Sequence, residues 1–153
     1  MPTKEHKTPG ARLDAGELHE LLGYLLAQAS IATNENFRRE VGKPLNLGKV
    51  EITILQLIKQ NTSVTPSRLA RALAISMPAV TVWIAKLEQR GLLLRQKNPN
   101  DFRSQHFCVT PEGDALVSKV ITTLVHADTQ TMKHMSPGER AMLFELLRKV
   151  ARR

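Results

Sequence analysis

The segment 97–104 (KNPNDFRS) carries side chains that are suited to contact a polyanion. Short apolar runs flank it, LLL before and HFCV after, and its proline and asparagines are typical of a tight turn, so we expect the tip of a β-hairpin. Arg103 at such a tip can enter the minor groove of DNA, where negative potential is concentrated. Asp101 could hold the guanidinium or cap the turn. The alternative is that the Asp101–Arg103 pair only staples a solvated hairpin.

A second group of candidate residues lies in the stretch 76–82 (SMPAVTV), where we expect a helix to begin. If this is the second helix of a helix-turn-helix, its first residues meet base edges in the major groove. Alanine and threonine can contact thymine methyl groups, and Ser76 or Thr81 can bond a base edge or a phosphate. No Asn, Gln or Arg precedes Lys86 in this helix, so we expect backbone and shape contributions to dominate specificity. The residues predicted to contact DNA are Ser67, Arg68, Ser76, Pro78, Ala79, Thr81, Val82, Lys86, Lys97, Asn100, Asp101, Arg103 and Ser104.

The positive charge is concentrated around these two groups. The chain has 153 residues, a formal net charge of +8 and a pI of about 10.1. Residues 63–113 hold seven Lys/Arg and three Asp/Glu, a balance of +4, which is half of the excess in a third of the length. Counterion release makes such a surface favour duplex DNA. A merely soluble basic protein is the alternative.

Several other classes of protein are not expected. The single cysteine, Cys108, excludes an intramolecular disulfide framework and a cysteine-based zinc ribbon, and the five histidines lack metal-ligand spacing. We find no apolar run of about 20 residues and no signal peptide, so a cytoplasmic protein is expected. No phosphate loop or nucleophile elbow is present, so we expect neither an enzyme nor a bound cofactor.

Three hydroxyl–proline pairs mark expected helix starts, because a Ser or Thr cap followed by proline suits the first turn. They are Thr65-Pro66, Thr110-Pro111 and Ser136-Pro137, and Ser136 with Glu139 has capping-box spacing. Hydrophobic periodicity predicts helices at about 14–41, 47–60, 66–73, 77–91, 111–135 and 137–151. Strands are expected at 92–96 and 105–109, with a very short one as an option at 63–64.

This order predicts a mostly α protein with a small β-hairpin wing, a winged helix-turn-helix flanked by N- and C-terminal dimerisation helices. We expect a disordered basic arm at 1–12 and a single domain at 13–153, with a DNA-binding core at about 47–110. The helices at about 13–42 and 111–152 carry apolar stripes too wide for this core to cover. A two-fold homodimer would bury them, and a self-packed monomeric bundle is the alternative.

The chain resembles the MarR family of bacterial transcriptional regulators from about residue 14 to 150. The resemblance rests on D-x-R-S-x5-T-x2-G at 101–113, VT at 80–81 with LE-x2-GL at 87–92, LGYLL at 22–26, and EITIL at 51–55. It implies a homodimer that places two recognition helices in successive major grooves of a palindromic operator. It also implies a repressor that leaves DNA when a small, often aromatic and anionic, compound binds between the dimer helices and the winged domain. The chain departs from many members at Val82, where they carry Arg, and at Ile52, where they carry an aromatic residue.

The candidate ligand site is built on polar residues of the first two helices. A carboxylate ligand requires a cation or a hydrogen-bond donor beside an apolar slot, which suggests His19, Tyr24, Lys49 and Thr53. The alternative is that His19 is structural and that Tyr24 packs at a dimer seam. Two other functions stay open: a winged helix used for protein–protein contact, and a ligand-independent or architectural DNA-binding protein.

Replacing Arg103 by alanine is expected to weaken operator binding sharply and to leave the protein folded, because the guanidinium would be lost from the minor groove. A gel shift with the wild type and the variant, alongside circular dichroism, measures both effects. Normal binding by the variant would refute the role given to the hairpin.

Overall fold

The computed structural model describes residues 13–98 and 101–151, and the side chains of 97–98 and 101–105 lie outside that description. A 3-10 turn at Gly16–Glu20 is followed by α1 (Leu22–Phe37), a π-helical turn (Arg38–Gly42) and α2 (Lys43–Leu45). Then come α3 (Lys49–Gln60), α4 (Pro66–Leu73), α5 (Met77–Gln89), β1 (Leu93–Asn98), β2 (Asp101–Val109), α6 (Pro111–Thr131) and α7 (Pro137–Val150). The mostly α, winged helix-turn-helix fold is therefore confirmed. The arm expected at 1–12 lies outside the described residues.

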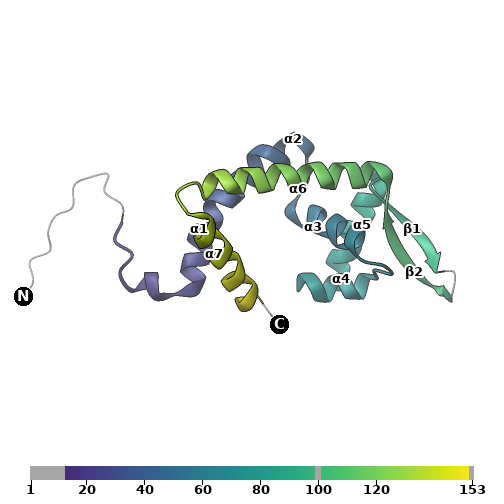
Figure 1. Cartoon of the computed structure of the whole chain (residues 1–153). Coiled ribbons are helices and arrows are strands. Elements are labelled where there is room, and N and C mark those ends of the chain that lie inside the picture. Colours follow the sequence, from purple (N-terminus) through teal and green to yellow (C-terminus); the bar gives the residue numbers. More distant parts are fainter. Residues whose placement is uncertain (1–12, 99–100, 152–153) are drawn as a thin grey trace, which may run out of the picture.

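Helix α6 connects two unlike ends of the molecule (Figure 1). At one end α3, α4, α5 and the antiparallel β1–β2 hairpin pack together, and α1 and α7 belong to the other end. The core belongs to the first end. Its largest fully buried side chains come from six elements: Val41 of the π-helical turn, Ile54 and Leu55 of α3, Leu69 of α4, Val80, Ile84 and Leu87 of α5, Leu93 of β1, and Val117 and Val120 of α6. Burying aliphatic side chains of this kind is the main source of stability.

The predicted helix starts are confirmed, and each works through a side-chain cap. Thr65 Oγ1 accepts a hydrogen bond from the backbone N–H of Arg68, and Ser76 Oγ accepts one from Ala79. Ser136 and Glu139 form the predicted capping box. The backbone N–H of Ser136 donates to the Glu139 carboxylate at 2.7 Å, which lowers the pKa of Glu139. Such caps satisfy N–H groups that have no partner within the helix.

The first predicted helix, 14–41, is wrong as a continuous element. Leu21 is extended, with φ −88° and ψ 116°, and separates the 3-10 turn from α1. The stop expected at Gly42 and Pro44 is also wrong, because the chain continues through the π-helical turn into α2. Pro44 lies near the beginning of α2, directly after the π-helical turn. The left-handed Asn46, with φ 47°, ends this helical run.

Three smaller boundaries also differ from the prediction. The option of a strand at 63–64 is not realised: Ser63 is left-handed, and Val64 only accepts one backbone hydrogen bond from Phe107. The two wing strands are longer than expected and pair from Leu93–Val109 as far as Asn98–Asp101. Helix α6 ends at Thr131 rather than 135, because the chain turns back through the Met135 N–H to Met132 carbonyl bond.

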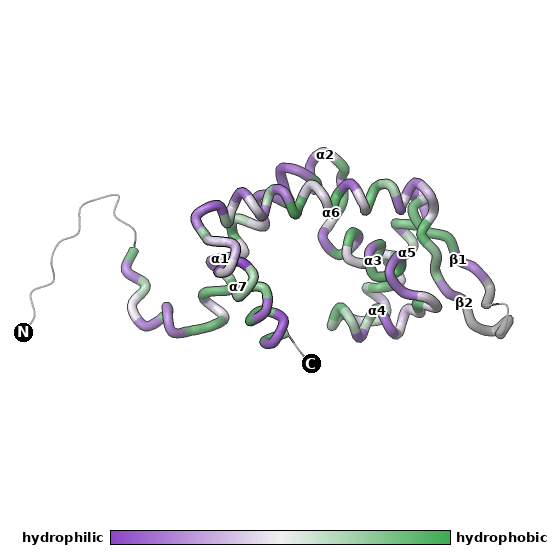
Figure 2. The backbone as a smooth tube through the Cα atoms, viewed as in Figure 1, coloured by the Kyte–Doolittle hydropathy of each residue, from purple (hydrophilic) through white to green (hydrophobic). Residues whose placement is uncertain are grey.

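The terminal helices are poorly covered within one chain. No residue of α7 is buried, and its apolar stripe is only half-buried at Leu143 and Leu147, with Leu146 and Val150 exposed. Large apolar side chains are also exposed along the 3-10 turn and α1: Leu18, Leu21, Leu22, Leu25, Leu26 and Ile31. Figure 2 shows apolar residues along α1 and α7, away from the packed α3–α5 end. A single chain therefore has too little surface at this end to cover the apolar stripes of the terminal helices.

None of the described helices alone is long and apolar enough to cross a bilayer, although α4 and α5, bent by 112°, meet the length and composition criteria as a pair.

The end of α5, the base of the β1–β2 wing and the start of α6 meet closely around Thr110. The Thr110 hydroxyl donates to the Gly91 carbonyl at 2.7 Å and accepts from the Gly113 N–H at 3.0 Å. Gly91, with φ 68°, ends the α5 segment, and Gly113 lies in the first turn of α6. A Cβ at Gly113 would lie 2.3 Å from the Leu92 carbonyl oxygen. The junction therefore has room for glycine only.

Replacing Gly113 by alanine is expected to lower the free energy of unfolding by about 1–3 kcal/mol or more, the usual cost of overpacking. Gly138→Ala in α7 is the matched control, because a Cβ there meets nothing within 4 Å. That variant is expected to be neutral or up to about 1 kcal/mol more stable. Urea unfolding of both variants measures the difference, and equal stabilities would contradict the close approach at Gly113.

Candidate nucleic-acid interface

Helix α5 presents one side to solvent and buries the other. Val80, Ile84 and Leu87 are buried against the core, whereas the predicted DNA-contact residues Pro78, Thr81, Val82 and Lys86 are exposed. Ser76 is exposed at the N-cap, and Ala79 is half-buried. Trp83 packs half-buried against the core, as expected, and Lys86 Nζ lies 4.6 Å from the centre of its ring. The structure therefore brings the α5 candidates onto one accessible surface, with only Ala79 set back.

The charge around α5 is partly used within the protein. The Arg90 guanidinium donates to the carbonyl oxygens of Asn46 and Leu45 at 2.7 and 2.9 Å, which fastens the end of α5 to the turn after α2. Arg95 donates to Glu88 at 2.7 Å, and this hydrogen bond raises the pKa of Arg95. These two cations contribute to the count of seven but already have protein partners. Fewer of these seven cations are therefore free to contact a polyanion than the sequence indicates.

The start of α4 offers a second candidate contact. Ser67 and Arg68 are both exposed, beside the cap formed by Thr65. Arg68 Nη1 donates to the carbonyl oxygens of Thr62 and Ser63, both at 3.1 Å, and so holds the loop before α4. A guanidinium has five N–H groups, so others remain for a phosphate.

Near the end of the wing the structure describes the backbone of 97–98 and 101–105. Asn100 lies outside the described residues, as do the side chains of Lys97, Asp101, Arg103 and Ser104, so their predicted DNA contacts stay predictions. The strands that carry them extend from the packed end of the molecule (Figure 1). The Cys108 thiol at the wing's base donates to Gln96 Oε1 at 3.2 Å.

The four predicted ligand residues form two separate pairs. The rings of His19 and Tyr24 meet edge to face at 5.6 Å. Thr53 donates to the Lys49 carbonyl, and Lys49 Nζ contacts Asn34 and lies 5.5 Å from the centre of the Phe37 ring. Tyr24 and Asn34 are ten residues apart on α1, about 15 Å along its axis at 1.5 Å per residue. One chain therefore does not assemble these residues into a single pocket.

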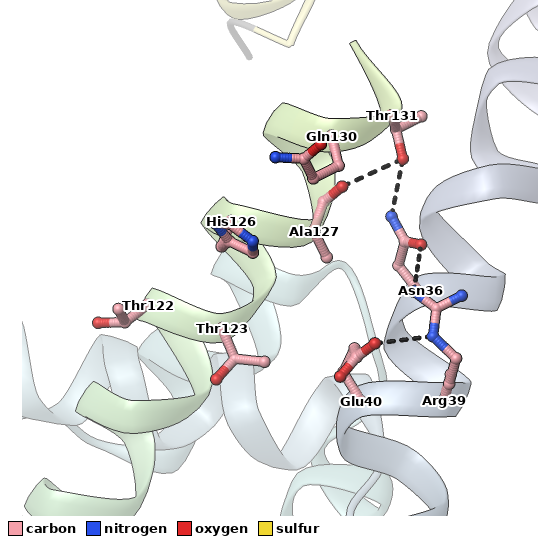
Figure 3. Close-up of a pocket in the computed structure, with 9 residues that line it drawn as sticks. All are labelled: Asn36, Arg39, Glu40, Thr122, Thr123, His126, Ala127, Gln130 and Thr131. Atoms are coloured by element: carbon pink, nitrogen blue, oxygen red, sulfur yellow. Dashed lines mark hydrogen bonds and ion pairs between the residues drawn. The ribbon is translucent and has the colours of Figure 1, made fainter. Parts of the chain in front are cut away.

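A cavity of about 700 Å³ lies elsewhere, between the end of α1 with its π-helical turn and the second half of α6. Its lining includes Thr122, Thr123 and His126 of α6 and Arg39 and Glu40 of the π-helical turn, and in Figure 3 Thr123 lies on the side of α6 toward Glu40. Arg39 donates to Glu40 at 2.7 Å, and the Asn36 amide donates to Thr131 at 2.9 Å. Sequence reasoning missed this cavity because its two walls are about 90 residues apart and share no motif.

Comparisons with known proteins agree with this geometry. The MarR family model matches residues 47–104. The homoprotocatechuate degradative operon repressor of Escherichia coli is 30% identical over 130 residues, 85% of this chain and 87% of that protein. The repressor CouR, bound to a 23-mer DNA duplex, superposes with a TM-score of 0.80 at 28% identity, over 93% of this chain and 100% of CouR. CouR bound to p-coumaroyl-CoA gives a TM-score of 0.76 at 27% identity, over 92% and 99%.

Lys86→Ala is expected to weaken DNA binding and to reduce the slope of log affinity against log salt concentration by about 0.9, the value for one phosphate contact. Arg90→Ala is the contrasting variant. It should lower the free energy of unfolding by about 1 kcal/mol, because it removes two hydrogen bonds to carbonyl groups, and leave the salt slope intact. Fluorescence anisotropy in a salt series and urea unfolding measure the two effects. An unchanged slope for Lys86→Ala would place that lysine away from phosphates.

Proposed function

The chain belongs to the MarR family of transcriptional regulators, and on that premise we propose that it is a homodimeric repressor which a small aromatic acid releases from an inverted-repeat operator. The observation that carries this proposal is the exposed N-terminal half of α5, whose other side is fixed in the core beside the wing. A helix held in this way can enter a major groove without reorganising. The likeness of CouR on its DNA duplex, over nearly the whole chain, supports the same use of α5.

The homodimer is proposed because of the apolar side chains that one chain leaves in water. Six of them, from Leu18 to Ile31, lie on the 3-10 turn and α1, and Met142, Phe144, Leu146 and Val150 lie on α7. Contiguous exposed apolar surface of this kind marks an interaction site. A second copy has the same surface, so a two-fold pair covers both at once. Two-fold symmetry then requires two recognition helices and a DNA site with an inverted repeat.

The aromatic acid is proposed from the chemistry around Lys49 and from two relatives. Lys49 combines an ammonium group with the nearby face of Phe37, and Thr53 lies one turn further along α3. An ammonium beside an aromatic face suits a carboxylate on an aromatic ring. The E. coli relative is named for homoprotocatechuate degradation, and CouR was solved with p-coumaroyl-CoA. His19 and Tyr24 stay candidates for the same ligand if a second chain brings them near Lys49.

A ligand-independent or architectural DNA-binding protein is the alternative function. Such a protein would bind DNA with an affinity that depends on salt concentration, but not on the DNA sequence or on metabolites. The apolar exposed surface of α5 argues against it, because binding that relies on phosphates alone would require more free cations there than Lys86.

The test is fluorescence anisotropy with DNA from upstream of the coding region and with scrambled DNA, at two salt concentrations. We expect at least about a thousandfold preference for one inverted repeat, the lower end for specific regulators. Adding hydroxylated phenyl carboxylic acids and their CoA thioesters should weaken this binding for at least one compound. Equal retention of scrambled DNA would reject the operator, and indifference to every compound would reject the aromatic effector.

A further inference from the structure

The exposed surface at the start of α5 is almost devoid of free hydrogen-bond donors. Pro78, Thr81, Val82 and Ala85 lie on the side opposite the buried Val80, Ile84 and Leu87. Val82 is 57% exposed, and Met77 beside them is 45% exposed. The surface that would meet the DNA bases is therefore made mostly of methyl and methylene groups.

Most of the few polar groups nearby are already engaged within the protein or too distant. The Thr81 hydroxyl donates to the Met77 carbonyl at 3.1 Å, so its proton is not free for a base. Ser76 Oγ accepts the Ala79 N–H in the helix cap, and its O–H, at the N-cap before the first helical residue, is the one nearby donor among the described side chains that has no partner here. Lys86 lies over the Trp83 ring, and Gln89 is at the far end of the helix, about 18 Å along the axis from Met77. From Met77 to Ala85 no side chain presents an uncommitted donor to a base edge.

An apolar surface can distinguish bases in the major groove through one chemical group. The C5 methyl of thymine is the only apolar group that the four standard bases present there. Removing this methyl and an exposed aliphatic side chain from water together is favourable, whereas a bare base edge against the same side chain loses its bound water without compensation.

We propose that α5 selects its operator by contacts between thymine C5 methyl groups and the side chains of Met77, Pro78, Val82 and Ala85; this inference rests on the proposed DNA-binding function. Val82 is the central contact because it is the most exposed large apolar residue of the helix. Lys86 and the wing supply attraction to phosphates, and the methyl contacts supply the preference for one sequence. 5-Methylcytosine carries the same methyl group and is the second possible source.

The experiment begins with selection of bound sequences from a random, unmethylated duplex library by the full-length protein. The selected half-sites should contain thymine at recurring positions. Each such thymine is then replaced by deoxyuridine, which keeps every base-pairing group and removes only the methyl. We expect about fourfold weaker binding for each contacted thymine, the effect of one buried methyl group. Uridine placed outside the half-sites is the matched control and should have no effect.

Variants of Val82 connect the effect to this helix. Val82→Ala should bind the thymine operator more weakly, and its affinity should change less than about twofold when the facing thymine becomes deoxyuridine, because the partner of that methyl is gone. Val82→Thr keeps the side-chain volume but replaces one methyl by a hydroxyl, and should also bind more weakly. Circular dichroism and thermal melting should match the wild type, since Val82 is exposed.

The outcomes separate this inference from the proposed function. Tight binding to one selected sequence with no loss on uridine substitution, or half-sites without thymine, overturns the methyl contacts and leaves the repressor intact. Full affinity of Val82→Thr also overturns them. Failure to select any sequence overturns both. Replacing half-site cytosines by 5-methylcytosine tests whether the methyl group comes from methylated cytosine instead. Higher affinity for the methylated DNA, together with no loss on deoxyuridine substitution, would show that the helix contacts 5-methylcytosine and not thymine.

Discussion

The Thr110 hydroxyl determines how the DNA-facing parts of this protein are placed relative to one another. It donates to the Gly91 carbonyl after α5 and accepts from the Gly113 N–H in α6, while the Thr110 N–H donates to the Leu92 carbonyl at the start of the wing. Thr110 is only 6% exposed, so these bonds are shielded from water. Recognition helix, wing and α6 are thus held at one point. The proposed release by a ligand would use this junction if binding turned α6 relative to α5.

The two ends of α6 differ in what stabilises them. The α3–α5 end has its own core, with Ile54, Leu55 and Val117 completely buried, and should keep its shape in a single chain. The α1–α7 end has no buried residue in α7 and exposes most of its leucines. Its stability therefore depends on protein concentration if a second copy covers it.

Sequence reasoning predicted features that are determined locally. The caps at Thr65, Thr110 and Ser136 depend on residues within one turn, and all three are confirmed. The outer face of α5 followed from helical periodicity. The break at Leu21 and the path through Pro44 were missed, because exposed and π-helical segments leave no periodic signal. Arg90 and Arg95 were counted as available charge, since their partners at Leu45, Asn46 and Glu88 are visible only in three dimensions. The separation of Lys49 from His19 is non-local in the same way.

The π-helical turn at Arg38–Gly42 makes the length of this segment matter more than its composition. A π-turn holds one residue more than an α-turn, so it resets the phase of the helix by about 100° for everything that precedes it. Val41 in this turn is 1% exposed and packs into the core. The leucines of α1, before the turn, are exposed instead. Deleting one residue here would turn the exposed leucines of α1 by about 100° relative to the core around α3–α5. In the proposed homodimer, two such chains would pair with a changed distance and angle between their α5 helices, which would no longer match successive major grooves.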